Sequence, residues 1–348
     1  MRYNRLGRTG LFVSELCLGT MTFGQSKGRY AAASGVGQDA VEAILSRAVD
    51  AGVNFIDTAD VYAEGQSEEI VGRAIRNLGI RRKDIVLATK FEHPTGPGPN
   101  DAGGSRKHIV DAVEASLKRL GTDHVDLYQM HGWDPATPVE ETVAALDDLV
   151  RRGLVRYLGV SNWAAWQVAT ALGLTERTGA ARFASYQGYY SLVGREIERD
   201  VLPALEHHGL SLIAFSPLAG GYLTGKYRNG LEGGRRKTIP FPPVDEMRGA
   251  KLLDAMEPIA TAHETSLEAV ALAWLRRQPA VASIITGVKS VEQLDANLRA
   301  TSVELSGEEI ETLGGIAGPN PEYPGWMLAQ GSAARASLLA TGALPGGE

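Results

Sequence analysis

The sequence has 348 residues, of which 44% are hydrophobic and 22% are charged, and its formal net charge is -6. This is the balance of a folded protein with a large apolar core, so disordered and fibrous classes are excluded. The negative net charge provides no summed positive field for a phosphate backbone, and we therefore expect no nucleic-acid partner.

The cysteine count and the lack of a recognisable targeting signal indicate the cellular compartment that we expect. Cys17 is the only cysteine, which excludes an intrachain disulfide and any thiolate-rich metal site. The basic N-terminus is not followed by the apolar stretch of a signal peptide, and no run approaches the roughly 18 apolar residues of a membrane span. We expect a cytoplasmic protein with no bound metal and no membrane contact.

Eight short apolar runs alternate with helical segments along the chain. The predicted strands are 16–20, 55–59, 85–90, 126–131, 155–161, 183–187, 212–217 and 282–287. The predicted helices are 39–51, 67–77, 105–120, 138–151, 163–172, 196–208, 250–278 (as two helices) and 290–300. Ser67, Ser105 and Ser290 are of a residue type that caps helix N-termini.

The alternation predicts a parallel sheet, because strands buried on both faces are apolar along their whole length. Polar residues gather where these strands end, for example at Thr20, Lys90 and Gln187. In a closed barrel all the loops that follow strands share one face, where such residues would meet. We therefore predict an α/β fold of the (β/α)8 TIM-barrel class, with an open doubly wound sheet as the alternative.

Both ends of the chain carry additions to this barrel. Gly7 and Gly10 separate short extended pieces within residues 1–15, which predicts a β-hairpin that plugs the bottom of the barrel. From about residue 302 we expect one helix, 307–316, and then a Pro/Gly-rich tail to residue 348. No linker-like shift in composition divides the chain, so residues 1–348 are expected to form a single domain.

Four residues near three strand ends suggest chemistry at the rim: Asp57, Tyr62, Lys90 and His131. A buried lysine needs an anionic partner, which Asp57 on the neighbouring strand can supply. A cation beside the Tyr62 phenol would lower its pKa toward neutrality and make it a usable general acid. With His131 orienting the same oxygen, Tyr62 can protonate a carbonyl oxygen while a hydride reaches the carbonyl carbon.

Three segments resemble motifs of the aldo-keto reductase family. They are 52–62 (GVNFIDTADVY), 159–163 (GVSNW) and 215–220 (FSPLAG). The resemblance extends from about residue 1 to residue 315 and points to the subgroup of potassium-channel β subunits and bacterial general-stress reductases. It implies a (β/α)8 barrel that binds NADP(H) without a Rossmann fold and reduces the carbonyl group of a small aldehyde or ketone.

The resemblance implies a role for each of the four rim residues. Tyr62 would be the proton donor, and Lys90 would adjust its pKa. Asp57 would pair with Lys90 and border the cofactor, while His131 would orient the carbonyl. With Tyr62, the implied substrate pocket contains Met21 and Trp133.

A longer set of residues is implied to bind the cofactor. Its members, besides Asp57, are Gly19, Thr20, Ser161, Asn162, Gln187, Phe215, Ser216, Pro217, Leu218, Gly220, Lys226, Gly287, Lys289, Gln293 and Asn297. Asn162 and Gln187 would hold the nicotinamide amide, and Phe215 would stack on the ring. The short-sided stretch from Ser216 to Lys226 suits a diphosphate. Lys289 is the candidate for a 2′-phosphate, which would favour NADPH over NADH.

The sequence departs from the family pattern at two places. Ala296 stands where related members often carry a glutamate that contacts the adenine. An insertion-like loop, 23–37, follows the first strand and can reshape the substrate mouth. Loop sequence alone names neither the natural substrate nor the oligomeric state, and a homo-oligomer is compatible with it.

Two other functions stay open on the sequence. A Schiff-base aldolase or isomerase would use Lys90 as its nucleophile and would need no nicotinamide. An NADPH-binding, redox-sensing subunit would retain the cofactor with little turnover, as the likeness to potassium-channel β subunits implies. Replacement of Tyr62 and measurement of NADPH consumption separate these classes.

Overall fold

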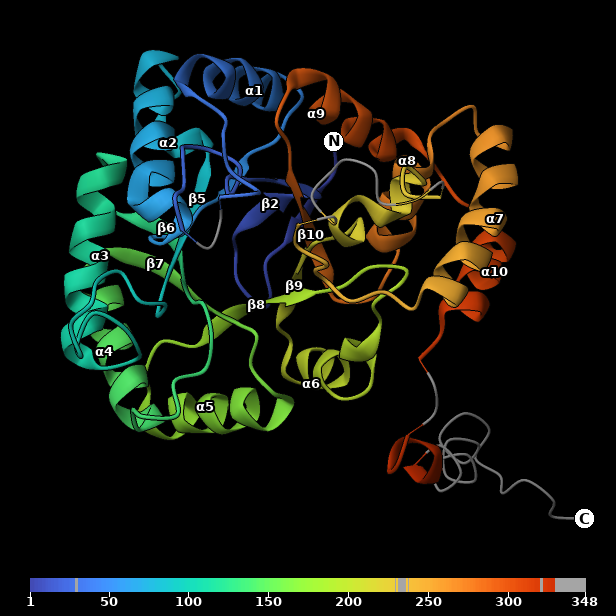
Figure 1. Cartoon of the computed structure of the whole chain (residues 1–348). Coiled ribbons are helices and arrows are strands. Elements are labelled where there is room, and N and C mark those ends of the chain that lie inside the picture. The colour runs from blue at the N-terminus through green and yellow to red at the C-terminus, as the bar shows by residue number, and fades with distance from the viewer. Residues whose placement is uncertain (29–30, 229, 231–235, 237, 320–321, 329–348) are drawn as a thin grey trace, which may run out of the picture.

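The computed structural model describes residues 1–28, 31–228, 230, 236, 238–319 and 322–328. At its centre is a closed barrel of eight strands in the order β10-β3-β4-β5-β6-β7-β8-β9, and every pairing is parallel. Figure 1 shows the helices as a ring around these strands. The (β/α)8 barrel is therefore confirmed, and the pairing of β10 with β3 excludes the open sheet.

Each barrel strand overlaps one of the predicted ranges. The strands are β3 (Leu16–Gly19), β4 (Phe55–Asp57), β5 (Val86–Phe91), β6 (Val125–Met130), β7 (Val155–Ser161), β8 (Phe183–Tyr189), β9 (Ser211–Phe215) and β10 (Val281–Gly287). The helices that follow them are α1 (Gln38–Asp50), α2 (Gln66–Asn77), α3 (Arg106–Leu120), α4 (Val139–Arg151), α5 (Ala165–Thr178), α6 (Val201–His208), α7 (Glu246–Ala262), α8 (Leu267–Arg276) and α9 (Val291–Leu298).

Two helices differ most from their predicted ranges, and α7 begins four residues before its predicted start at residue 250. α5 continues to Thr178 instead of ending at residue 172, because Leu174 and Thr175 extend its buried face beyond the exposed Gly173. The predicted helix 196–208 is divided into a 3-10 turn, η3 (Glu196–Glu198), and α6. Glycine in a helix costs only about 1 kcal/mol, so buried apolar contacts outweigh it in α5.

The helix N-termini confirm two of the three predicted caps. The Ser105 hydroxyl accepts a hydrogen bond from the His108 amide, and the Ser290 hydroxyl accepts one from the Gln293 amide. The prediction for Ser67 is wrong. α2 begins one residue earlier, after Gly65, whose φ of 91° is left-handed.

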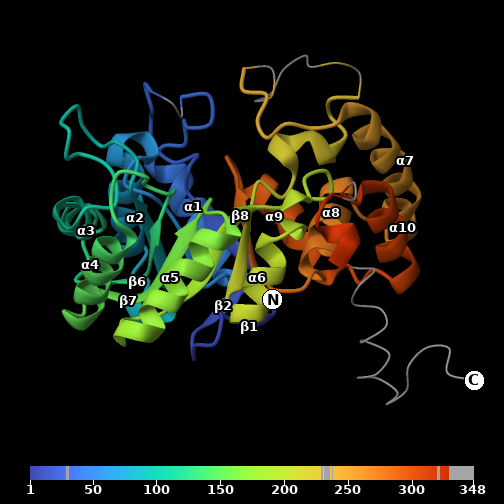
Figure 2. The ribbon, with the colours of Figure 1, turned by 90° about the horizontal axis from the view of Figure 1, so that it is seen from below.

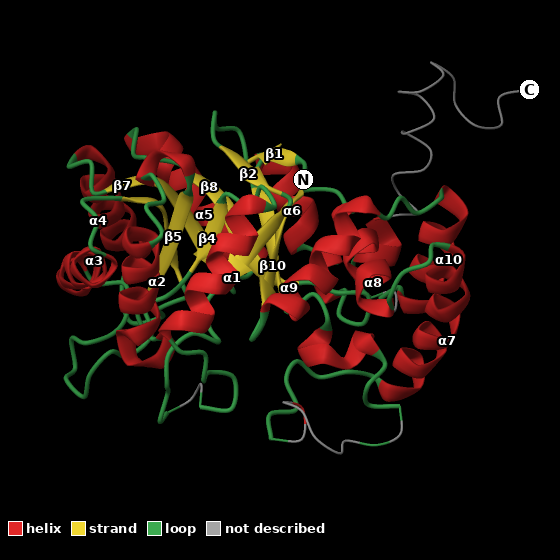
Figure 3. Cartoon of the chain, turned by 90° about the horizontal axis from the view of Figure 1, so that it is seen from above, coloured by secondary structure: helices red, strands yellow, loops and turns green. Residues whose placement is uncertain are grey.

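The N-terminal hairpin closes one end of the barrel. β1 (Tyr3–Arg5) pairs antiparallel with β2 (Phe12–Ser14). Leu6 and Val13 are fully buried and pack into an apolar cluster inside the barrel with residues such as Phe55. Figures 2 and 3 show this hairpin at one end of the strands and the long loops at the other. The predicted plug at the bottom of the barrel is confirmed.

The C-terminal region adds the helix α10 (Gly307–Ala317) outside the ring, and residues 325–328, within the predicted Pro/Gly-rich tail, are also helical. α10 matches the predicted helix and packs against α7. Residues 329–348 of the predicted tail lie outside the described residues. Among the helices described, none combines the length and the apolar character that crossing a membrane requires.

Candidate functional site

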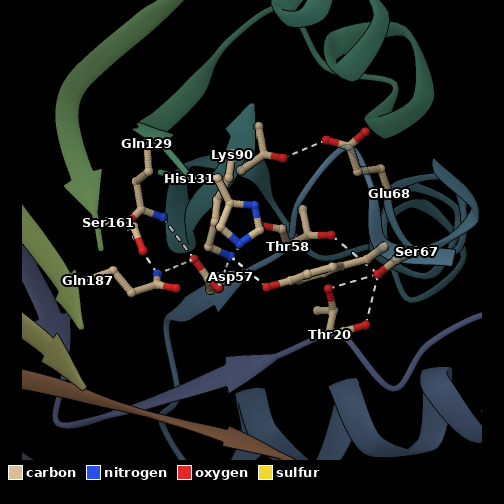
Figure 4. A network of polar contacts seen from close by, with 12 residues as sticks. Thr20, Asp57, Thr58, Ser67, Glu68, Lys90, Gln129, His131, Ser161 and Gln187 are labelled. Atoms are coloured by element: carbon tan, nitrogen blue, oxygen red, sulfur yellow. Dashed lines mark hydrogen bonds and ion pairs between the residues drawn. The ribbon is translucent and has the colours of Figure 1, made fainter. Parts of the chain in front are cut away.

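The four rim residues lie together where β4, β5 and β6 end. Asp57 is the last residue of β4, and Tyr62 begins the 3-10 turn η1 (Tyr62–Gly65) that follows it. Lys90 is near the end of β5, and His131 comes directly after β6. Figure 4 shows Asp57, Lys90 and His131 side by side at this end of the barrel. All four side chains are buried, with exposed fractions of 8% or less.

Lys90 is the hub of the polar contacts. Its ammonium donates to Asp57 Oδ2 at 2.5 Å, to the Thr58 carbonyl at 2.8 Å and to the Tyr62 hydroxyl at 3.1 Å. An ammonium has three protons, so these bonds use its full donor capacity. Because the Tyr62 oxygen accepts from Lys90, the phenol hydrogen is not consumed in this contact.

The charge of Lys90 is fixed by its surroundings. Burial alone would lower the pKa of Lys90, but the Asp57 carboxylate and the neighbouring Tyr62 raise it well above its ordinary value. The side chain is therefore an ammonium at neutral pH. An ammonium is not a nucleophile, so this geometry argues against Lys90 as a Schiff-base residue.

Asp57 is held on its other side by two amides that come from β6 and β8. Gln129 and Gln187 donate their Nε2 atoms to Asp57 Oδ1 at 2.9 Å and 3.0 Å, and Gln187 also donates to Gln129 Oε1 at 3.2 Å. Sequence reasoning missed Gln129. Side chains alternate along a strand, so a residue two before His131 shares its face, and this spacing could have identified it.

The start of α2 is anchored against the barrel and sets the path of the turn that carries Tyr62. The Ser67 hydroxyl donates to Thr20 at 2.9 Å instead of capping the helix. Glu68, which Figure 4 shows beside Ser67, is fully buried. It accepts from Thr89 at 2.5 Å and pairs with Arg119 at 2.6 Å. A buried carboxylate that is paired and hydrogen-bonded on both oxygens is a rigid anchor.

His131 is fixed by ring and backbone contacts. Its ring stacks on His93 with centroids 4.4 Å apart and faces the Tyr62 ring edge-on at 6.0 Å. Its amide donates to the Phe91 carbonyl at 2.9 Å, and its carbonyl accepts from Asn162 Nδ2 at 3.0 Å. His93 was not predicted, and its position in a loop gave no periodic signal.

The strand register aligns several of the predicted cofactor residues at the same rim. Gly287 pairs with Gly19, and Gly19 pairs with Asp57. Ser161 pairs with Gln187 on the opposite side of the barrel. Thr20 follows Gly19 and donates its amide to the Asp57 carbonyl at 3.0 Å.

The segment after β9 has an unusual backbone. Phe215 ends β9 with its ring 6.1 Å from that of Tyr189, and Pro217 and Leu218 follow. Ser216 has a φ of 50°, and Gly220 has a φ of 66° within the 3-10 turn η4 (Ala219–Thr224). The exposed Lys226 lies beyond this turn, with its ammonium over the Tyr227 ring.

The segment after β10 places Lys289 at the start of α9. Its amide donates to Gln293 Oε1 at 2.8 Å, and its ammonium donates to the Ser34 carbonyl at 3.0 Å. Asn297 is buried near the end of α9, away from this N-terminus. A helix N-terminus with an adjacent lysine suits an anion.

Of the residues predicted for the substrate pocket, Tyr62 is buried, and Met21 and Trp133 are half-buried. Met21 lies in the turn after β3. Trp133 follows His131 and packs edge-on against Trp163, with centroids 4.8 Å apart, and against the exposed Trp166 at 5.8 Å. The loop after β6 is therefore held by aromatic contacts with the loop after β7.

The comparisons with known proteins agree with this architecture. The model of the Aldo/keto reductase family matches residues 15–317. The chain is 40% identical over 312 residues to a probable voltage-gated potassium channel subunit beta of Arabidopsis thaliana, covering 87% of this chain and 92% of that protein. It is 38% identical over 334 residues to the uncharacterized oxidoreductase YrpG of Bacillus subtilis, covering 93% and 98%.

A third relative has a named reaction. The chain is 33% identical over 348 residues to the versiconal hemiacetal acetate reductase of Aspergillus parasiticus, covering 93% of this chain and 99% of that protein. The family model covers most of the chain, and these relatives are matched over nearly their full lengths. The chain therefore belongs to the Aldo/keto reductase family of oxidoreductases.

Proposed function

We propose that this protein catalyses the reversible NADPH-dependent reduction of a small aldehyde or ketone to an alcohol. The observation that carries the proposal is the contact of one buried ammonium, that of Lys90, with both the Asp57 carboxylate and the Tyr62 hydroxyl. A cation at this distance stabilises a phenolate, and a phenol that can become a phenolate is an acid.

Tyr62 donates the proton in the proposed reaction. The nicotinamide, when bound, supplies the hydride that the carbonyl carbon receives. As the carbonyl oxygen gains negative charge, the Tyr62 hydroxyl gives it a proton and the product is an alcohol. The phenolate that remains is stabilised by Lys90 at 3.1 Å until solvent returns the proton.

The other two residues of the set hold this arrangement in place. Asp57 neutralises Lys90, and the two glutamine amides on its second oxygen keep it in one orientation. His131, wedged between Tyr62 and His93, orients the carbonyl oxygen by donating a hydrogen bond to it.

The chemistry of the rim fits a dinucleotide. Gly287 leaves open space, because an added Cβ would meet nothing closer than 3.9 Å. Ser216 and Ala219 adopt left-handed backbone, with φ values of 50° and 49°, next to Gly220. Such turns aim backbone amides at anions, and strained backbone is typical of binding sites. We assign this segment to the pyrophosphate and Lys289 to the 2′-phosphate.

The nicotinamide end of the site has a polar pair and an aromatic ring. Asn162 is exposed at the rim, while the nitrogen of Gln187 is already bonded to Asp57. Gln187 therefore offers its amide oxygen as an acceptor. The Asn162 nitrogen is bonded to the His131 carbonyl, so Asn162 also offers its amide oxygen. We assign Phe215 to stacking on the face of the nicotinamide ring.

The test follows the loss of NADPH absorbance with an aromatic aldehyde for wild type and Tyr62→Phe, with NADH as a comparison. We expect Tyr62→Phe to lose roughly 100- to 10,000-fold in kcat, the usual contribution of a general acid. Tyr3→Phe is the matched control, because it removes a hydroxyl bonded to the Gly52 carbonyl at the opposite end of the barrel. Unchanged turnover after Tyr62→Phe would refute the assigned proton donor.

A second candidate function is an NADPH-binding, redox-sensing subunit with little turnover. The observation that favours it is the 40% identity to a protein named as a potassium channel subunit beta. In the same assay this function predicts tight NADPH binding with negligible consumption of NADPH by wild type. No binding of NADPH would contradict both functions.

A further inference from the structure

A segment between β3 and α1 connects the two ends of the proposed cofactor site. We call its described residues, 22–28 and 31–36, the β3–α1 segment. Its two arms are residues 22–28 and residues 31–36. They are joined by backbone hydrogen bonds from the Gly24 amide to the Val36 carbonyl at 2.9 Å and from the Gly35 amide to the Gly24 carbonyl at 2.8 Å. Phe23 and Val36 are buried at its base. The two arms therefore move together.

One arm of the β3–α1 segment holds Lys289. The Lys289 ammonium donates to the Ser34 carbonyl at 3.0 Å, and Lys289 is exposed. A phosphate accepts a stronger, charge-assisted bond from an ammonium than a neutral carbonyl does. Ser34 accepts only one of the three ammonium protons. A phosphate therefore weakens this bond by drawing the exposed ammonium toward itself, and not by taking its only donor.

The other arm holds the turn that follows Tyr62. Ser26 donates its amide to Ser34 Oγ at 3.0 Å and its hydroxyl to Glu64 Oε1 at 2.8 Å. The Gly28 amide also points at Glu64 Oε1, at 3.3 Å. The contacts from Lys289 to Glu64 thus form one chain through Ser34 and Ser26.

The turn at Glu64 has a backbone that needs outside contacts to persist. Ala63 and Glu64 have φ values of 48° and 56°, and Gly65 follows with a φ of 91°. Consecutive left-handed residues with side chains are uncommon, and they are stable only where the surroundings fix them. Glu64 lies two residues after Tyr62, so its contacts with Ser26 constrain the backbone that carries the phenol.

We propose that Glu64 is a positioning residue for Tyr62, and that a phosphate bound by Lys289 changes this position by displacing the Ser34 carbonyl. Binding of a phosphate at the adenosine end of the site then shifts the Tyr62 hydroxyl through the contacts of the β3–α1 segment. This inference rests on the proposed function, because it needs Tyr62 as the acid and a 2′-phosphate at Lys289.

The first experiment measures amide hydrogen exchange in the full-length protein without substrate. The probe is adenosine 2′,5′-bisphosphate, which carries the 2′-phosphate but lacks the nicotinamide and therefore does not cover Tyr62. We expect faster exchange in peptides that contain residues 22–28 and 61–66 when the probe binds. ADP, without a 2′-phosphate, should leave both peptides unchanged.

Variants of Lys289 test the same link without a ligand. Lys289→Met should accelerate exchange in both peptides of the ligand-free protein, and the probe should have no further effect. Lys251→Met is the matched control, because it removes an exposed lysine of α7. If Lys289→Met leaves both peptides unchanged, or if the probe binds wild type with no change near Tyr62, the inference is wrong. Failure of the probe to bind in calorimetry would instead contradict the assigned cofactor.

The second experiment tests Glu64 by kinetics. Glu64→Ala should lower kcat roughly tenfold with an unchanged KM for NADPH, as expected when a reacting group is displaced by a fraction of an ångström. Glu64→Gln should restore kcat, because its amide oxygen still accepts from Ser26. Glu69→Ala, an exposed glutamate of α2, is the control. Equal kcat for Glu64→Ala and wild type would overturn the positioning role.

Discussion

The two ends of the barrel interior are built from opposite chemistry. At the end closed by the hairpin, apolar side chains such as Leu6, Val13 and Phe55 fill the space. At the other end, Lys90 and Asp57 form a buried ion pair surrounded by amides. The first end can contribute only to stability, whereas the second carries the groups that we propose to react.

The same strands supply both ends through the two-residue period of a β-strand. Phe55 belongs to the apolar cluster, and Asp57 points into the same interior two residues later. In β5, Ala88 lies in that cluster, and Lys90 follows it at the same spacing. A single strand therefore changes from apolar to ionisable side chains along one face, over about 7 Å.

The largest effect is expected from breaking the ion pair at the polar end. Lys90→Met leaves the Asp57 carboxylate buried without its cation, which costs about 3–5 kcal/mol in the free energy of unfolding. The same change removes the group that stabilises the Tyr62 phenolate, so turnover of NADPH should be lost as well. Urea unfolding followed by circular dichroism measures the first effect.

A double variant separates the charge from the shape of this pair. Lys90→Met combined with Asp57→Asn removes both charges, so the protein should recover part of the lost stability but none of the activity. If the single Lys90→Met change costs less than about 1 kcal/mol, water reaches Asp57, and the pair is not buried in solution as the structure describes.

The next largest effect is expected at the apolar end, and it should be confined to stability. Leu6→Ala removes a fully buried side chain and should cost about 2–5 kcal/mol. The kcat of the folded protein should stay within twofold of wild type. Phe12→Ala, in the same hairpin but 55% exposed, is the control and should cost about 0.5 kcal/mol or less. A large fall in kcat for Leu6→Ala would mean that the two ends are coupled.

The strands and the clustering of the candidate site residues could be predicted because both depend on local patterns. Strands of a barrel are buried on both faces, so they are continuous apolar runs, and their polar ends mark the rim. Asp57, Lys90 and His131 stood out because each is an ionisable residue directly at the end of an apolar run. The fold needed only the periodicity of these elements and their number.

The residues that were missed depend on contacts between distant segments. Ser67 has the residue type of a cap, but it donates to Thr20, which lies far from it in the sequence. Gln129 is uncharged, so a search for ionisable groups passed over it, although it bonds to Asp57. The contact of Lys289 with Ser34 joins residues 255 positions apart in the sequence and leaves no local signal.

Asp60 is a second buried aspartate at the polar end, and Lys90 does not bond to its carboxylate. Among the described residues, neither of its carboxylate oxygens has a side-chain hydrogen-bond partner. Burial, reinforced by the nearby Glu68 carboxylate, raises the pKa of Asp60 well above its ordinary value, against the weaker opposing effect of Arg119. The folded protein therefore binds this proton more tightly than the unfolded chain does.

The sign of the pH effect follows from that difference. As the pH rises above about 4, the unfolded chain loses this proton while the folded protein keeps it, so the free energy of unfolding falls. Asp60→Asn should therefore match wild type near pH 4 and be more stable by about 1 kcal/mol at pH 8, measured by urea unfolding. The exposed Asp50→Asn change should show no such trend. An equal shift at both pH values would mean that water in the adjoining cavity of about 270 Å³ already solvates the Asp60 carboxylate.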